Sequence, residues 1–256
     1  MTLKGKTALV TGSTSGIGLG IALSLAEAGA DLLLNGFGEV DAALAQVRAR
    51  GVRAEHHPAD LSSPEQIGEL MAFAERTFGG ADILVNNAGI QYVAPVQEFP
   101  TERWDAIIAI NLSSVFHTTR LALPGMLARG WGRIVNLSSI AGKVGLPDLA
   151  HYCASKFAVI GFSNALAKEV ARDGVTVNAL CPGIVGTGMW RGEDGLSGRW
   201  RQAGESEAQS WERHQASLLP QGEAQTVEDM GQLVVYLACA PHVTGQAIAV
   251  DGGFSL

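Results

Sequence analysis

Short apolar runs alternate along the chain with longer stretches in which apolar side chains recur every three or four positions. Apolar runs of about five residues that end at Gly, Pro or Asn are typical of strands buried on both faces of a sheet. Such runs, some of which contain fewer apolar residues, predict strands at residues 7–10, 31–35, 53–57, 82–86, 133–137, 175–180 and 246–250. The recurring pattern predicts helices at residues 16–28, 40–50, 64–78, 104–129, 152–172 and 226–238.

This alternation predicts an α/β fold: a Rossmann-like, doubly wound parallel sheet with helices on both faces. With no repeat or linker in view, residues 1–256 are expected to form a single domain. Residues 183–223 break the rhythm, because they are polar and rich in Gly, Arg, Glu and Trp. A disordered surface insertion is one interpretation. Trp190, Trp200 and Trp211 favour an ordered substrate lid at about 186–222, because a tryptophan is costly to leave exposed.

The composition of the chain excludes several classes of binding partner. Hydrophobic residues make up 47% of the chain and the formal net charge is −7, so nucleic acid and anionic membranes are expected not to bind. We expect no membrane span, because no stretch approaches about 18 apolar residues, and no secretory signal. Cys153, Cys181 and Cys239 are far apart, which favours reduced, packed thiols and no metal site. The expected location is the cytoplasm.

A glycine-rich loop follows the first predicted strand and opens the first helix. Glycines let the backbone turn tightly and approach a pyrophosphate, while the helix N-terminus offers free amides and a positive dipole end. An ordinary glycine-rich turn is the alternative interpretation. The residues expected to hold the cofactor here are Gly12, Ser15, Gly16, Ile17 and Gly18.

The second predicted strand ends at residues 34–38 without Arg or Lys, and Phe37 offers only apolar surface. A 2′-phosphate would lack a counter-ion there, so we expect NAD(H) to be preferred over NADP(H), although the usual carboxylate for the ribose is also missing. Asp60 and Leu61 follow the third strand, where they can meet the adenine; Asp60 could also cap the helix before Pro64. Asn87, Ala88 and Gly89 follow the fourth strand, at the edge where ligands bind in such sheets.

Tyr152 and Lys156 are four residues apart, which puts both on one helix face. A nearby ammonium favours the phenolate and lowers the pKa of a tyrosine, so the pair is a candidate acid/base. Ser139 ends the preceding strand and can bond the substrate oxygen. Asn111 lies in a long apolar helix. Its amide could hold a water in a proton relay towards Lys156, or it could be a satisfied buried asparagine.

In order and spacing these motifs resemble the short-chain dehydrogenase/reductase family over nearly the whole chain. The resembling pieces are Thr11 to Gly18, Asn86-Asn87-Ala88-Gly89, Asn111, Ser139, Tyr152-Cys153-Ala154-Ser155-Lys156 and Cys181-Pro182-Gly183. The resemblance implies a roughly seven-stranded sheet, a homotetramer and no metal. It implies a catalytic tetrad of Asn111, Ser139, Tyr152 and Lys156, with Tyr152 and Lys156 also touching the cofactor. It further implies that the nicotinamide is flanked by Pro182, Gly183, Val185 and Thr187.

The two halves resemble different members of that family. The first half is most similar to bacterial D-3-hydroxybutyrate dehydrogenases, where the position of Gln91 binds the substrate carboxylate. That group has a carboxylate-binding His and Lys where this chain has Ala141 and Leu149. Lys143 or His151 could compensate, or both could be solvated loop side chains. The second half, through Met189-Trp190, looks more like diol, acetoin and polyol dehydrogenases, which makes Trp190 a further substrate candidate.

We therefore expect an NAD(H)-dependent oxidoreductase that interconverts a secondary alcohol and a ketone, with residues 1–256 as a single dinucleotide-binding and catalytic domain. Tyr152 would take the hydroxyl proton while the carbinol hydride passes to the cofactor. A small hydroxy acid such as 3-hydroxybutyrate is slightly favoured over a neutral diol, polyol or sugar-derived hydroxy compound. A non-catalytic NAD-binding sensor is the rival from another class. The chain keeps the serine, asparagine, tyrosine and lysine that such a protein could lose.

Overall fold

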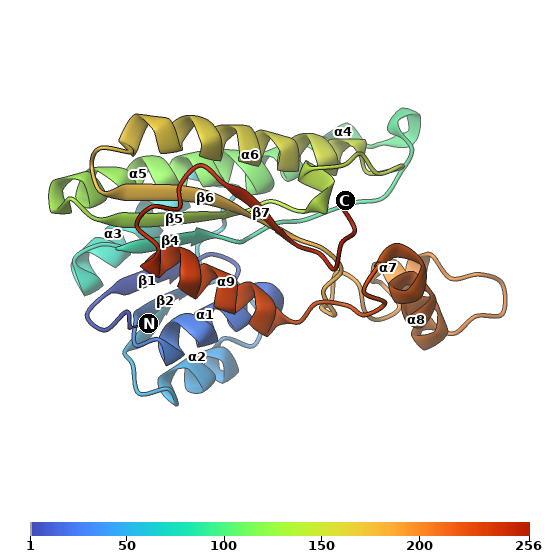
Figure 1. Ribbon diagram of the computed structural model, residues 1–256, viewed down its shortest axis with the longest axis horizontal. Coiled ribbons are helices and arrows are strands. Elements are labelled where there is room, and N and C mark those ends of the chain that lie inside the picture. Colours follow the sequence, from blue (N-terminus) through green and yellow to red (C-terminus); the bar gives the residue numbers. More distant parts are fainter. Residues whose placement is uncertain (1) are drawn as a thin grey trace.

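The computed structural model describes residues 2–256 and has one parallel sheet between two layers of helices (Figure 1). The sheet has seven strands in the order β3-β2-β1-β4-β5-β6-β7, and every neighbouring pair is parallel. The strands are β1 (Thr7–Val10), β2 (Asp31–Asn35), β3 (Ala54–His57), β4 (Ile83–Asn86), β5 (Gly132–Leu137), β6 (Val175–Pro182) and β7 (Ala247–Val250). The predicted doubly wound α/β fold is confirmed.

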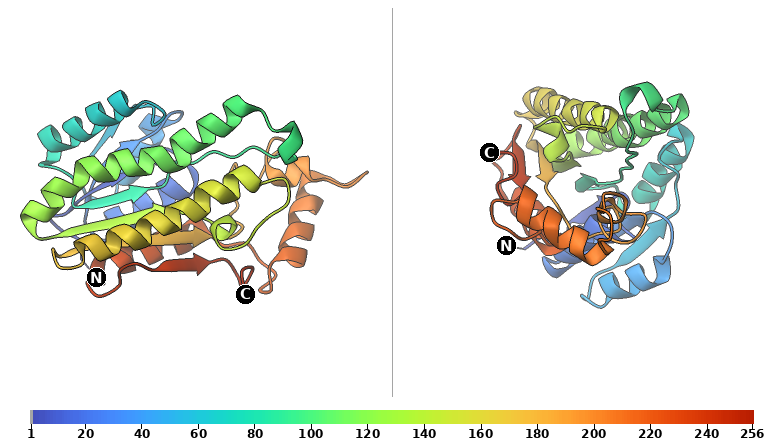
Figure 2. Two further views of the ribbon diagram at one scale, coloured as in Figure 1. Left: turned by 90° about the horizontal axis from the view of Figure 1, so that it is seen from above. Right: turned by 90° about the vertical axis from the view of Figure 1, so that its right-hand side faces the viewer.

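Each face of the sheet packs on its own set of helices (Figure 2). One face is covered by α1 (Gly16–Glu27), α2 (Val40–Arg48) and α9 (Val227–Cys239), and the other by α3 (Pro64–Phe78), α5 (Ser114–Arg129) and α6 (Ala150–Val170). Alternate residues of one strand serve the two faces. Ala8 and Val10 pack in the core with α1 and α9, whereas Leu9 packs in the core with α3 and α5. The strand order reverses between β1 and β4, which opens a crevice at their carboxyl ends.

One helix is longer than expected. The helix α4 (Thr101–Ile108), a π-helical turn (Ala109–Ser113) and α5 run on without a break. By length and mean hydropathy alone this helix could cross a membrane, contrary to our expectation from the sequence. Its inner residues, among them Val115, Ala122 and Met126, are buried, and α5 contacts α3, β4 and β5. The apolar stretch therefore forms part of the core.

Residues 186–222, which we call the α7–α8 segment, stand apart from the layers in Figure 1. They contain α7 (Leu196–Arg199) and α8 (Glu207–Leu218), and a β-bridge between Val185 and Gln225 closes their neck. Trp190 lies edge-on to Trp200 and Trp211, with ring centroids 6.0 and 6.1 Å apart. These rings give the segment an apolar core of its own, as the tryptophans in its sequence had suggested.

Candidate active site

A cavity of about 730 Å³ runs along the carboxyl ends of the strands and under the α7–α8 segment. Its volume suits a cofactor or substrate. Most of the residues singled out from the sequence line it: Gly12, Ser15, Ile17, Gly18, Phe37, Asp60, Leu61, Asn87, Ala88, Gly89, Gln91, Ser139, Tyr152, Lys156, Pro182, Gly183, Val185, Thr187 and Trp190. Gly16, Asn111, Lys143 and His151 are outside the lining.

The backbone of the glycine loop packs closely on itself and on the segment after β4. A Cβ on Gly18 would collide with the carbonyl oxygen of Gly12, and a Cβ on Gly12 would lie 3.0 Å from the Cα of Ala88. Asn87 fixes the loop, because its Nδ2 donates to the carbonyl oxygens of Thr11 and Gly12 at 2.8 and 3.0 Å. Ser15 precedes α1 but makes no side-chain capping bond, which leaves the first turn open towards an anion.

The far end of the cavity is acidic and apolar. Phe37 is 63% exposed at its edge. The Oδ1 of Asp60 accepts from the amide of Ser62, 2.8 Å away. Ser63, not Asp60, caps α3, so the capping role considered for Asp60 was wrong. Among residues 2–256 the charged side chains of the lining are Asp60, Asp148 and Lys156. No arginine or lysine therefore stands at this end.

Tyr152 and Lys156 lie on the first turns of α6, which begins at Ala150, two residues earlier than predicted. The Nζ of Lys156 donates to the carbonyl oxygen of Leu137 at 2.8 Å. Its ammonium lies 5.5 Å from the centre of the Tyr152 ring. Ser139 follows β5, and its hydroxyl lies close enough to the Tyr152 phenol to lower the pKa of that phenol. A proton donor, a cation and a hydroxyl thus meet in one buried corner.

Burial sets the pKa of both titratable groups. It raises the pKa of Tyr152 to about 12, and the nearby Ser139 hydroxyl offsets only part of this rise. It lowers the pKa of Lys156 to about 8, and Cys181 opposes this shift in part. The sequence led us to expect that Lys156 would lower the pKa of Tyr152. That expectation does not hold for the protein alone, because desolvation of the phenolate outweighs the ammonium at this distance.

Asn111 lies in the π-helical turn, a feature frequent at functional sites. Its Oδ1 accepts from the amide of Ile90, and its Nδ2 donates to the carbonyl oxygen of Ile90 and to Ser155. Both amide hydrogens are therefore used to tie the loop after β4 to α6. The spare lone pair of Oδ1 is the group left for a water. It faces Gly89, as the Nζ of Lys156 does, since both atoms would lie 3.4 Å from a Cβ built there.

The candidate substrate residues divide into two groups. Gln91 and Trp190 line the cavity. Lys143 turns away, and its Nζ donates to the carbonyl oxygen of Ala247, 3.3 Å away on β7. His151 is buried; its Nε2 is 2.5 Å from the carbonyl oxygen of Tyr92 and its ring stacks on a phenylalanine. The structure therefore does not bring Lys143 or His151 to the substrate end.

Several lining residues had not been singled out from the sequence. Among them are Leu146, Asp148, Leu196, Leu218 and Phe254. The Pro147-Asp148 pair signals a turn, which is how Asp148 could have been noticed. Asp148 adopts a left-handed backbone with φ 59°. Phe254 comes from the end of the chain, and no sequence pattern points from there to the cavity.

Comparison with known proteins identifies the family. Residues 6–195 match the model of the short chain dehydrogenases. The D-beta-hydroxybutyrate dehydrogenases of Cupriavidus necator and Rhizobium meliloti are 48% and 45% identical to this chain, each covering 98% of both chains. A solved structure described as a putative short-chain alcohol dehydrogenase from Sinorhizobium meliloti has a TM-score of 0.89 at 34% identity, covering 99% of this chain and 97% of that one.

The chain belongs to the short-chain dehydrogenase family. It is accordingly an oxidoreductase that acts on CH–OH groups, and the family points to a nicotinamide cofactor. The cavity beside Tyr152 is lined by apolar side chains. Ala141 and Leu149 pack there with Tyr152 and Cys153, and Leu146 and Trp200 pack against them.

Proposed function

We propose that the protein is an NAD(H)-dependent dehydrogenase that interconverts a secondary alcohol and a ketone in this cavity. The observation that carries the proposal is that the phenol of Tyr152, the hydroxyl of Ser139 and the ammonium of Lys156 gather at one place in the cavity. All three side chains line the same cavity as the glycine loop. Proton transfer at Tyr152 can therefore occur next to a bound dinucleotide.

In the proposed reaction, the Ser139 hydroxyl orients the substrate oxygen towards the Tyr152 phenol. During oxidation the substrate O–H proton passes to the phenolate oxygen of Tyr152, while the carbinol C–H bond breaks and the carbonyl forms. The hydride and its two electrons would go to a nicotinamide held by the glycine loop and the residues around Thr187. Lys156, fixed by Leu137, supplies positive charge near the phenolate. Asn111 keeps α6 in register with the loop after β4.

The cavity residues fit a dinucleotide without a 2′-phosphate. The loop that packs Gly12 and Gly18 against Asn87 leaves room for a pyrophosphate, and the first turn of α1 is uncapped. At the other end the amide of Asn35 is used by the backbone, since its Nδ2 donates to His57 and Ala59. Phe37 and Asp60 offer no positive charge to a 2′-phosphate. These features support NAD(H) over NADP(H).

Two substrate classes follow from different observations. Similarity to the two D-beta-hydroxybutyrate dehydrogenases favours a small hydroxy acid such as 3-hydroxybutyrate. The substrate end, whose described lining holds no positive side chain besides Lys156, favours a neutral diol, polyol or sugar-derived hydroxy compound over an acid. Gln91 and Trp190 are proposed to contact either substrate.

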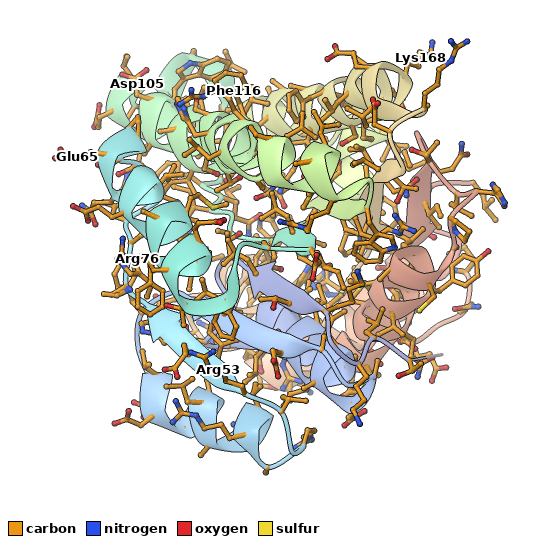
Figure 3. All side chains as sticks on the ribbon, turned by 90° about the vertical axis from the view of Figure 1, so that its left-hand side faces the viewer. Arg53, Glu65, Arg76, Asp105, Phe116 and Lys168 are labelled. Carbon is orange, nitrogen blue, oxygen red and sulfur yellow. The ribbon has the colours of Figure 1, made fainter. Side chains whose placement is uncertain are left out.

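We further propose that residues 1–256 act as one catalytic unit, with the α7–α8 segment as the substrate lid, in a homotetramer. Trp104, Phe116 and Phe157 are 42%, 47% and 47% exposed on α4, α5 and α6, which suits a contact between subunits. Phe116 is labelled on the outer side of the helix layer in Figure 3. A cytoplasmic location agrees with three free cysteines.

The proposal is tested with a panel of secondary alcohols and either NAD or NADP, following the absorbance of the reduced nicotinamide. We expect turnover with NAD and a loss of at least about 100-fold in Tyr152→Phe, with cofactor binding retained. Tyr236→Phe, on the exposed face of α9, is the matched control and should behave as the wild type. Turnover in Tyr152→Phe equal to the wild type would remove Tyr152 from the mechanism. Binding of NAD without turnover of any alcohol would favour a sensor.

A further inference from the structure

The substrate end of the cavity carries a negative charge, on Asp148, that no neighbouring positive side chain of the described residues pairs with. Its apolar lining includes Ala141, Leu146, Leu149, Trp190 and Trp200, and Leu146 and Trp200 pack against the cluster of Ala141 and Leu149. Apart from Lys156, which is bonded to the Leu137 carbonyl beneath the phenol, the charged side chain of the described lining here is the carboxylate of Asp148. A carboxylate on a substrate would therefore enter an apolar pocket beside another negative charge.

Five of the positive groups nearest in the chain are committed elsewhere, and Arg199 of α7, which makes no ion pair within the described residues, lies outside the described lining. In the α7–α8 segment, Arg191, Arg201 and Arg213 pair with glutamates of the same segment at 2.9, 2.7 and 2.8 Å. The guanidinium of Arg213 also donates to the carbonyl oxygen of Trp200. Lys143 bonds the backbone of β7, and His151 bonds the Tyr92 carbonyl. None of these five side chains belongs to the described lining of the cavity.

Asp148 is fixed at the rim by its backbone. It is the one non-glycine residue of the described chain with a positive φ, and its carbonyl oxygen accepts from the amide of Ala94 at 3.1 Å. Aspartate tolerates this conformation better than most residues. Its side chain is exposed, and the ion pairs of the described residues do not include it. An unpaired carboxylate held at the mouth of an apolar pocket repels anions.

We infer that the enzyme selects an uncharged hydroxy compound and discriminates against hydroxy acids, with the apolar substituent of the substrate packed between Leu149 and the rings of Trp190 and Trp200. The inference rests on the proposed dehydrogenase function and names the substrate class of the same site. Charge selection follows from repulsion by Asp148 and from the missing counter-ion. Overall similarity to hydroxybutyrate dehydrogenases does not supply that counter-ion, since Ala141 and Leu149 are apolar.

Three probes isolate the charge, because they share one alcohol: 3-hydroxybutyrate, 3-hydroxybutyramide and methyl 3-hydroxybutyrate. Initial rates of NAD reduction give kcat/KM for each. We expect both neutral probes to exceed the acid at least about tenfold. Salt should narrow the gap, because it screens Asp148. An acid as good as the amide and the ester would overturn the inference and leave the dehydrogenase function intact. No NADH from any probe would count against the proposed function itself.

Two variants test the cause of the selection. Asp148→Asn keeps a side chain that tolerates the left-handed backbone, and it should lower the ratio of neutral to acidic kcat/KM about threefold. Leu149→Lys adds an ammonium to the wall and should lower that ratio about tenfold or more, whereas Leu149→Met should not. Asp173→Asn, which removes an exposed carboxylate before β6 at the opposite edge of the sheet, is the charge control. If Leu149→Lys fails to fold, Asp148→Asn decides alone. A ratio unchanged in Asp148→Asn would overturn the assigned cause.

Discussion

The ammonium of Lys156 lies 5.5 Å from the centre of the Tyr152 ring, and both groups are buried on successive turns of α6. Burial raises the pKa of the phenol to about 12 and lowers the pKa of the ammonium to about 8. The protein alone therefore holds Tyr152 ready to give a proton rather than to take one.

The first prediction concerns the pH dependence of the two directions. The phenolate fraction rises tenfold per pH unit below the pKa of Tyr152, which lies near 12. Alcohol oxidation, which needs the phenolate, should therefore speed up about tenfold per pH unit from roughly pH 6 to 8, while ketone reduction, which needs the phenol, stays flat. Steady-state kcat/KM profiles in both directions check this. An oxidation rate that levels off below about pH 7 would show that bound cofactor lowers the pKa of Tyr152 by several units.

The second prediction concerns stability. The pKa of Lys156 is about 8 in the folded chain and 10.5 in its unperturbed state. The unfolded chain then binds more protons between these values, so the free energy of unfolding rises with pH across this window. Below about pH 8, Lys156 is charged in both the folded and the unfolded chain, so the cost of burying its ammonium lowers the free energy of unfolding in full. From about pH 7.5 to pH 10, the unfolding free energy of the wild type should gain about 2 kcal/mol relative to Lys156→Met. Denaturant titrations of both proteins at each pH provide the measurement, and a constant difference would contradict it.

The third prediction contrasts two glycines in helices. A Cβ on Gly18 would collide with Gly12 and would lie 2.5 Å from the Nδ2 of Asn87, whereas a Cβ on Gly68 of α3 would meet nothing within 4 Å. Gly18→Ala should weaken NADH binding more than about tenfold and destabilise the fold by about 1–3 kcal/mol. Gly68→Ala should bind normally and gain about 0.5–1 kcal/mol. Fluorescence titration with NADH and chemical denaturation measure both. Normal NADH binding by Gly18→Ala would show that the loop can shift.

The fourth prediction concerns the α7–α8 segment. Glu207 accepts hydrogen bonds from Arg191, Ser197 and the amide of Gly192, and those partners lower its pKa to about 2. Glu207→Ala should loosen the segment, raise the substrate KM about fivefold and speed tryptic cleavage within 186–222, with little change in Tm. Glu193→Ala is the control, since Glu193 is 70% exposed and pairs with Arg201 alone. Equal proteolysis of the two variants would show that Glu207 does not hold the segment.

The fold could be predicted from the sequence because strand and helix periods are local properties. Several boundaries moved by a few residues, as at β6, which runs two residues further, to Pro182. The short helices α7 and α8 were missed because their order comes from three tryptophans packing together rather than from a periodic pattern.

The site was predictable where the spacing along one helix fixes it, as for Tyr152 and Lys156. It was not predictable where a side chain bonds a distant segment. Lys143 bonds the backbone of β7, and His151 bonds the loop after β4. The direction of the Tyr152 pKa shift likewise depends on burial, which no spacing reveals.

The bridge between Val185 and Gln225 closes the neck of the α7–α8 segment, and the segment carries its own tryptophan core. The α7–α8 segment is therefore a self-packed unit that joins the rest of the protein at its neck. Its length and sequence can diverge between related enzymes while the sheet and the Tyr152 corner stay constant. New substrate preferences can thus be acquired, or grafted by an engineer, by exchanging one loop-borne unit without redesigning the catalytic machinery.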